Sequence, residues 1–257
     1  MSSIWNTLAM FDFGIQWVGF GISYLFGTEL FYDLTGSLSY ITVLALTTAY
    51  KNSLSQSQKI QIGLTAIWAI RLGAYLFIRI LKTGEDKRFR SIKKSIWRLF
   101  IVWNLQGIWV LVTLYPTLKM VLKSTHVPIK CINMIGWLIF LIGLSIEVIA
   151  DKQKWNFKAN ITNKGEYIHT GLWKHCRHPN YLGEILLWCG MYLSSWSHIT
   201  SLQERSIALI SPVFVAILLI KGSGIPLLER AADHQWGSRL DYQNYKKNTP
   251  CLIPFIW

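Results

Sequence analysis

The stretch GLWKHCRHPNYLGE, residues 171–184, places several reactive side chains directly before an apolar run. Arg177 has the planar guanidinium group that pairs with phosphate or carboxylate oxygens. His178, Tyr181 and Glu184 supply further hydrogen-bonding and proton-transfer groups. Tyr181 and Glu184 are three residues apart, so a helix would present them on one face. The stretch therefore predicts a polar site at the start of a helix.

A purely structural explanation covers part of this stretch. Pro179 suits the first position of a helix, and the side chain of Asn180 or of a neighbour would cap the exposed amide groups. A helix start alone does not explain why Arg, His, Tyr and Glu side chains occur together at residues 177, 178, 181 and 184. We therefore favour a binding site over a simple helix start.

A metal site is the less favoured interpretation of the same stretch. His175, Cys176 and His178 are ligand types, but three adjacent groups without a distant fourth partner do not define a zinc site. We expect no metal. A basic pocket for a phosphorylated ligand fits the residues better.

The composition indicates where such a pocket would lie. Of 257 residues, 52% are hydrophobic and 15% charged, whereas a soluble domain carries about 25% charged residues. The 13 Trp, 11 Tyr and 12 Phe are residue types that gather at membrane interfaces. The net charge of +13 comes from clusters between apolar runs, which is typical of membrane topology rather than nucleic-acid binding. We predict an integral membrane protein surrounded by lipid, with no nucleic-acid partner.

The apolar runs predict an all-α, polytopic membrane fold, organised as one domain over 1–257. A membrane-spanning helix needs about 20 mainly apolar residues. We count seven candidate spans, at about 13–31, 36–50, 60–81, 97–118, 131–150, 181–197 and 205–221.

The distribution of Lys and Arg predicts the orientation. The loops on one side of seven spans hold 19 of these residues and the loops on the other side hold 6. Because the cytosolic side of a membrane protein carries the excess, the C-terminus is predicted to be cytosolic. Arg71 falls inside a predicted span, where a charge normally faces a cavity or a partner.

Two segments resemble a known family. The string GLWKHCRHPNYLGEILLWCG and the ending YQNYKKNTPCLIPFIW resemble the C-terminal signature of steroid 5-alpha-reductase-related membrane proteins. The resemblance is strong over 147–257 and weaker at WAIRLGAYLFIRILKTGEDKRFR. It places the chain with the uncharacterised branch of that family.

This resemblance implies an activity and a cofactor. It implies a seven-span protein that binds NADPH in a cytosol-facing cavity and reduces a carbon–carbon double bond of a lipid-like steroid, sterol or related enone. The membrane would be that of the endoplasmic reticulum in a eukaryote or the inner membrane in a bacterium. Neither the substrate nor the oligomeric state is predicted. The implied cofactor-binding residues are Arg71, Tyr75, Asp151, Lys158, Arg177, His178, Asn180, Tyr181, Glu184, Arg230 and His234.

The substrate half of the site departs from the steroid reductases. In those enzymes a Glu of an early span and a Tyr of the third span polarise the steroid carbonyl. Trp68 stands where that Tyr would be, and an indole cannot donate a proton in this role. Asp33 is the nearest candidate for the acid. The sequence therefore assigns no catalytic residue, and Asp33 is a candidate only.

Two other functions stay open. Isoprenylcysteine carboxyl methyltransferases have a similar R-H-P-x-Y-x-G string and bind S-adenosylmethionine, but they usually show paired Glu residues where this chain has Glu229 alone. The segment from Asp151 to Lys158 and the LIPFIW ending favour the reductase. The third possibility is a non-catalytic, lipid-binding relative.

Overall fold

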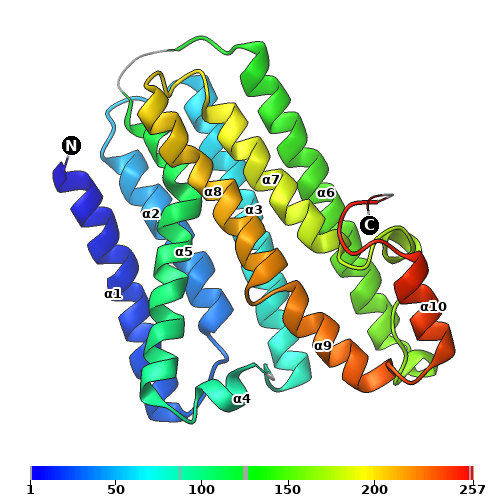
Figure 1. Ribbon diagram of the computed structural model, residues 1–257. Coiled ribbons are helices and arrows are strands. Elements are labelled where there is room, and N and C mark those ends of the chain that lie inside the picture. The colour runs from blue at the N-terminus through cyan, green and yellow to red at the C-terminus, as the bar shows by residue number, and fades with distance from the viewer. Residues whose placement is uncertain (1, 87, 124–126, 255, 257) are drawn as a thin grey trace. The chain divides into compact units, whose positions relative to one another are not determined.

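A computed structural model describes residues 2–86, 88–123, 127–254 and 256 (Figure 1). This part of the chain is helical and contains no strand, which confirms the all-α prediction. The helices are α1 (Ser2–Phe26), α2 (Tyr32–Ala49), α3 (Gln56–Thr83), α4 (Phe89–Ile92), α5 (Ile96–Leu122), α6 (Cys131–Ala159), α7 (Pro179–Ser195), α8 (Leu202–Lys221), α9 (Ile225–Trp236) and α10 (Leu240–Asn248), with 3-10 turns η1 (Ile161–Asn163) and η2 (Gly171–Lys174).

Local sequence explains where several helices begin and end. Ser55 accepts a hydrogen bond from the Gln58 amide, and the Gln58 side chain accepts one from the Ser55 amide, which forms a capping box before α3. Gly84 ends the same helix with a φ of 79°, a left-handed conformation that favours glycine. The predicted span at 60–81 lies inside this helix.

Five helical segments are long and apolar enough to cross a membrane: Ser3–Phe26, Gln56–Thr83, Ile96–Leu122, Cys131–Ala159 and Leu202–Trp236. The predicted spans at 36–50 and 181–197 form α2 and α7, which have 18 and 17 residues and are not among the five. The chain therefore has the helices of an integral membrane protein. Seven spans and a cytosolic C-terminus stay predictions.

The helices fall into two compact units. Unit 1 contains the described residues up to Ile129 together with Ser197–Ala208, and unit 2 contains Lys130–Trp196 and the described residues from Leu209 onward. That residues 1–257 form one membrane domain stays a prediction.

In unit 1, α1 packs against α2 and α5, and α2 also packs against α3 (Figure 1). Tyr32 of α2 meets the rings of Phe89 and Trp103 edge-on, with centroids 4.9 and 5.0 Å away. Phe89 and Trp103 are buried with Leu99 in one apolar cluster. The short helix α4 is thereby fixed against α5.

A polar layer lies in the middle of α1. Asp12 and Gln16 are one turn apart and fully buried, and Gln16 Nε2 donates to Oγ of Ser39 on α2 at 2.9 Å. Neither carboxylate oxygen of Asp12, nor Oε1 of Gln16, has a hydrogen-bond partner among the described residues. An ionised carboxylate without a partner is costly inside a membrane protein.

In unit 2, α6 and α7 run side by side and touch through their backbones (Figure 1). Gly136 and Gly143 of α6 face Gly190 and Gly183 of α7. A Cβ atom added to Gly143 would lie 2.6 Å from the carbonyl oxygen of Gly183, and one added to Gly183 would lie 2.6 Å from that of Gly143. Only glycine permits this approach. The close contact fixes α7, and hence the start of the predicted site, against α6.

Candidate functional site

The stretch 171–184 forms the turn η2, a short loop and the first part of α7. Pro179 occupies the first helical position, as predicted. The predicted side-chain cap is wrong, because His178 is the N-cap residue and makes no capping hydrogen bond. Asn180 lies inside the helix instead, and its Nδ2 donates to Oδ1 of Asp151 on α6 at 3.4 Å. Asn180 is thus a cross-helix contact rather than a cap.

Arg177 holds the C-terminal segment against the start of α7. Its Nε donates to Oε1 of Glu229 at 3.2 Å, and one terminal nitrogen donates to the carbonyl oxygens of Lys246 at 2.6 Å and Thr249 at 3.0 Å. Its backbone amide donates to the carbonyl oxygen of Pro250 at 2.9 Å. Because these donors bind acceptors of the protein itself, Arg177 positions the C-terminal segment against the start of α7.

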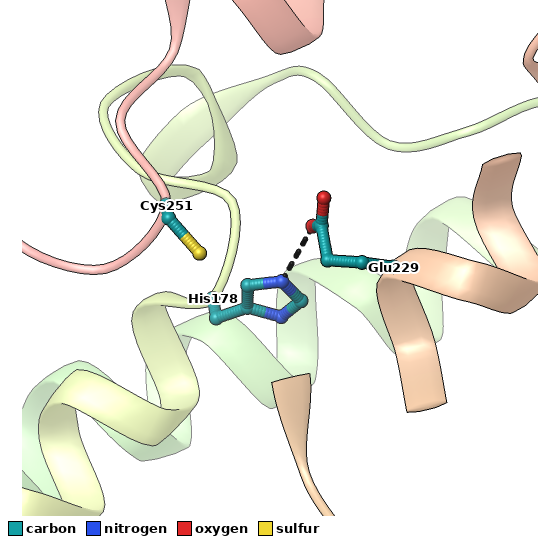
Figure 2. A group of neighbouring side chains, drawn as sticks. All are labelled: His178, Glu229 and Cys251. Atoms are coloured by element: carbon teal, nitrogen blue, oxygen red, sulfur yellow. Dashed lines mark hydrogen bonds and ion pairs between the residues drawn. The ribbon is translucent and has the colours of Figure 1, made fainter. Parts of the chain in front are cut away.

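His178 lies between α7 and α9 and is 5% exposed. Its Nε2 lies 2.8 Å from Oε1 of Glu229 (Figure 2), and its ring stacks on Tyr181 with centroids 5.7 Å apart. Burial lowers the pKa of His178 below its usual value, against the opposing effect of Glu229. The neutral ring then donates from Nε2 and keeps a lone pair on Nδ1, which has no partner among the described residues.

His178, Glu229 and Cys251 form a compact group whose ligand atoms all lie within 4.8 Å of one another (Figure 2). These are donor types that zinc accepts. Two cationic side chains already pair with Glu229, however, since Arg177 lies 3.2 Å and Lys246 3.4 Å from its carboxylate. Burial also raises the pKa of the Cys251 thiol, which favours the protonated form that does not bind metal. We interpret the group as an ion-pair cluster.

The acidic side of the candidate site lies on α6. Asp151 is buried beside Asn180, and Glu147, one turn earlier, is buried beside Gly183. Glu184 is half-buried on α7. The structure thus brings the predicted residues Asp151 and Asn180 together.

The other predicted residues of unit 2 are exposed. Lys158 lies near the end of α6, and Arg230 and His234 lie one turn apart on α9. Arg230 and His234 have no acidic partner among the described residues. The Nζ atom of Lys154 lies 4.7 Å from the ring centre of Trp173, a cation–π contact.

The remaining predicted residues belong to unit 1. The guanidinium of Arg71 lies 5.4 Å from the ring centre of Tyr75, one turn along α3, so the charge has an aromatic neighbour. Asp33 lies 3.8 Å from Arg79. Trp68 is buried and meets Tyr40 edge-on with centroids 5.0 Å apart. A phenol of α2 therefore lies beside the indole that stands in the expected Tyr position.

Comparison with known proteins identifies the family. The family model described as "Protein of unknown function (DUF1295)" matches residues 19–249. The chain belongs to the DUF1295 family. The same comparison supports the wider relationship to steroid 5-alpha-reductases that the motifs indicated.

Curated relatives of this DUF1295 protein are proteins named 3-oxo-5-alpha-steroid 4-dehydrogenase 1. The rat protein is 28% identical over 121 residues, which cover 47% of this chain and 40% of the relative. The human protein is 29% identical over 125 residues, 48% of this chain and 42% of the relative. The chain thus matches about two fifths of the length of these relatives. No solved structure matches it.

The most important residue that sequence reasoning missed in this DUF1295 chain is Glu229. Its carboxylate pairs with the side chains of His178, Arg177 and Lys246. In the sequence it was noted only as a single Glu where a methyltransferase has two. Tyr245 was not among the predicted site residues either, and its hydroxyl donates to the carbonyl oxygen of Trp173 at 2.7 Å. The sequence signal that could have indicated Glu229 is an acidic residue shortly after an apolar run, in a chain that also places His178 directly before another apolar run.

Proposed function

We propose that the protein is a membrane-embedded, NADPH-dependent reductase of a carbon–carbon double bond in a lipid-like substrate such as a steroid, sterol or related enone. The observation that carries this proposal is the polar site at the start of α7. There Asp151 meets Asn180, and His178 keeps a buried, unpartnered Nδ1 atom. The relatives named as steroid dehydrogenases supply the reaction class.

The residues of unit 2 fit a dinucleotide phosphate. Such a ligand needs cations for its phosphates and a few precisely oriented polar groups for its ring and ribose. Arg230 and His234 are exposed and have no acidic partner among the described residues, so they are available for phosphate. The lone pair on His178 Nδ1 is available to accept a hydrogen bond from an amide or hydroxyl group.

The protein would orient reactants rather than supply the reducing electrons. When bound, NADPH supplies a hydride, and reduction of the double bond needs one proton in addition. Asn180, held by Asp151, and Tyr181, held by His178, would orient the cofactor. Trp68 cannot supply the proton, and Asp33 remains only a candidate because it lies beside Arg79. Arg71 and Tyr75 stay predicted cofactor contacts.

We further propose seven spans with a cytosolic C-terminus, in the endoplasmic reticulum of a eukaryote or the inner membrane of a bacterium. The excess of Lys and Arg on one side supports this orientation. In this arrangement α2 and α7 complete the set of spans, and the site at the start of α7 lies on the cytosolic side, where NADPH is available.

One observation favours the methyltransferase as a second candidate. Arg177 and His178 of the R-H-P string meet Glu229 on α9, so the string and a C-terminal acidic helix form one cluster. That arrangement is what an S-adenosylmethionine pocket of the rival family implies. The absence of a second Glu at this point of the sequence argues against it.

Thermal stability of the detergent-purified protein tests these candidates, with NADPH, NADH and S-adenosylmethionine titrated in parallel. A ligand that binds only the folded state stabilises it by about 2.7 kcal/mol at 100 times its Kd. We expect stabilisation by NADPH, a roughly tenfold weaker Kd in Asn180→Ala, and no change in the exposed control Asn52→Ala. Stabilisation by S-adenosylmethionine alone would transfer the proposal to methyl transfer. No response to any ligand would indicate a non-catalytic relative.

A further inference from the structure

The connection between α3 and α5 carries a dense group of basic side chains in unit 1. Its position is well defined, because Phe89 is buried against Leu99 and Trp103 and so fixes α4 to the start of α5. The basic side chains around this anchor are exposed: Arg88, Arg90, Lys93, Lys94 and Arg98.

Three of these cations are neutralised within the protein. Arg88 pairs with Asp86, Arg90 pairs with Glu85, and the Nζ atom of Lys93 lies 2.5 Å from Oε2 of Glu29. Lys94 and Arg98 are different, because neither has an acidic partner among the described residues. Two uncompensated charges therefore remain four residues apart, where α5 begins.

An apolar strip continues from these two charges along α5. Trp97, Ile101 and Leu105 follow one another at every fourth residue, and they are 72%, 54% and 48% exposed. This spacing places them on one face of the helix. Because α5 is one of the five candidate spans, that face lies at the level of acyl chains, and Trp97 lies where tryptophan favours the membrane interface.

We propose that Lys94 and Arg98 bind the phosphate of an anionic phospholipid whose acyl chain lies along Trp97, Ile101 and Leu105. The charges complement an anionic headgroup, and the strip complements the chain attached to it. A zwitterionic headgroup fits less well, since its amine repels the same two cations. In the proposed topology this Lys- and Arg-rich loop lies on the cytosolic side, and the cytosolic leaflet holds the anionic lipids.

The site is separate from the proposed reductase function and does not depend on it. The lipid would be a structural partner of unit 1, whereas the candidate cofactor residues around His178 belong to unit 2. Loss of lipid binding would therefore leave NADPH binding in place, and the two proposals can fail separately.

Binding of phosphatidylglycerol and phosphatidylcholine to the purified full chain, counted by native mass spectrometry, tests the site. The variant K94Q/R98Q removes both charges. The control K59Q/K221Q removes two other exposed charges that have no acidic partner among the described residues. At roughly fivefold per charge, we expect about 25-fold weaker binding of phosphatidylglycerol to K94Q/R98Q and little change in the control. Phosphatidylcholine binding should be the same in all three proteins.

Equal affinity of wild type and K94Q/R98Q for phosphatidylglycerol would overturn the proposal. An equal loss in K59Q/K221Q would also overturn it, because the attraction would then follow net charge rather than this site. The single variant K94Q guards against misfolding, and we expect about a fivefold loss from it. The variant W97A should weaken phosphatidylglycerol and phosphatidylcholine alike, since it changes only the apolar part.

Discussion

The Nε2 atom of His178 lies 2.8 Å from Oε1 of Glu229, although 51 residues separate them in the sequence. The same oxygen receives Nε of Arg177 at 3.2 Å. The Glu229 carboxylate thus links the start of α7 to α9, and the geometry of the candidate site depends on that link.

Removal of this carboxylate should loosen the site. In Glu229→Ala, Arg177 and His178 lose their shared partner in a half-buried position, and we expect the free energy of unfolding to fall by roughly 2 kcal/mol. Glu229→Gln keeps an acceptor oxygen and should lose less. Thermal unfolding in detergent measures both. Glu166→Ala is the control, since it breaks the exposed pair with Arg239 and should leave the melting temperature nearly unchanged.

Acidification should destabilise the folded protein through His178. Burial holds its pKa below the ordinary 6.5, so between these two values the unfolded chain binds the proton more readily than the folded chain. Stability is therefore complete above about pH 6.5 and declines as the pH falls. Melting temperature measured from pH 8 to pH 5 should fall less steeply in His178→Asn. The exposed control His175→Asn should follow the wild type, and identical slopes in all three would contradict the assignment.

The contact between α6 and α7 should not tolerate a methyl group. In Gly143→Ala the new Cβ would meet backbone atoms of Gly183 and Leu187 at 2.6 Å, and backbone cannot rotate away as a side chain can. We expect a loss of roughly 1–3 kcal/mol. Gly63→Ala is the matched control, because a Cβ there meets nothing within 4 Å and alanine favours a helix. A melting temperature unchanged by Gly143→Ala would show that the helices can separate at little cost.

Asp12 should tolerate an uncharged amide. Its oxygens are buried without partners among the described residues, so a charge there has nothing to offset its desolvation. We expect Asp12→Asn to melt at or above the wild-type temperature. Asp12→Ala should melt lower, because it leaves a space beside Gln16 and Ser39. A large loss in Asp12→Asn would instead indicate an ionised carboxylate with a role that the amide cannot fill.

The sequence predicted the helices well where the signal is local. Apolar runs marked α1, α3, α5, α6 and α8, since length and hydropathy alone decide whether a segment suits a membrane. Pro179 was placed correctly because proline suits the first position of a helix, which is also a local signal. The predicted bounds were wrong for two helices. The helix α1 runs from Ser2 to Phe26 rather than over 13–31, and α6 continues past residue 150 to Ala159 because hydropathy does not register its polar last turns.

The partners of the site residues were beyond sequence reasoning. Asn180 carries a side chain that suits a cap, yet its contact with Asp151 depends on how closely two glycine-lined helices approach. Likewise, nothing near Arg177 in the sequence shows that its donors are taken up by Glu229 and by carbonyl groups of the C-terminal segment. Long-range contacts of this kind follow from packing, which a single sequence does not display.

The tether formed by Arg177 also has a consequence for biosynthesis. The carbonyl group of Lys246 that receives its guanidinium leaves the ribosome 69 residues after Arg177 itself. Until that segment has emerged, the loop before α7 lacks its anchors, and the guanidinium has only water or lipid phosphate to contact. The candidate site is therefore completed late in translation, only after the segment that carries Lys246 has been synthesised.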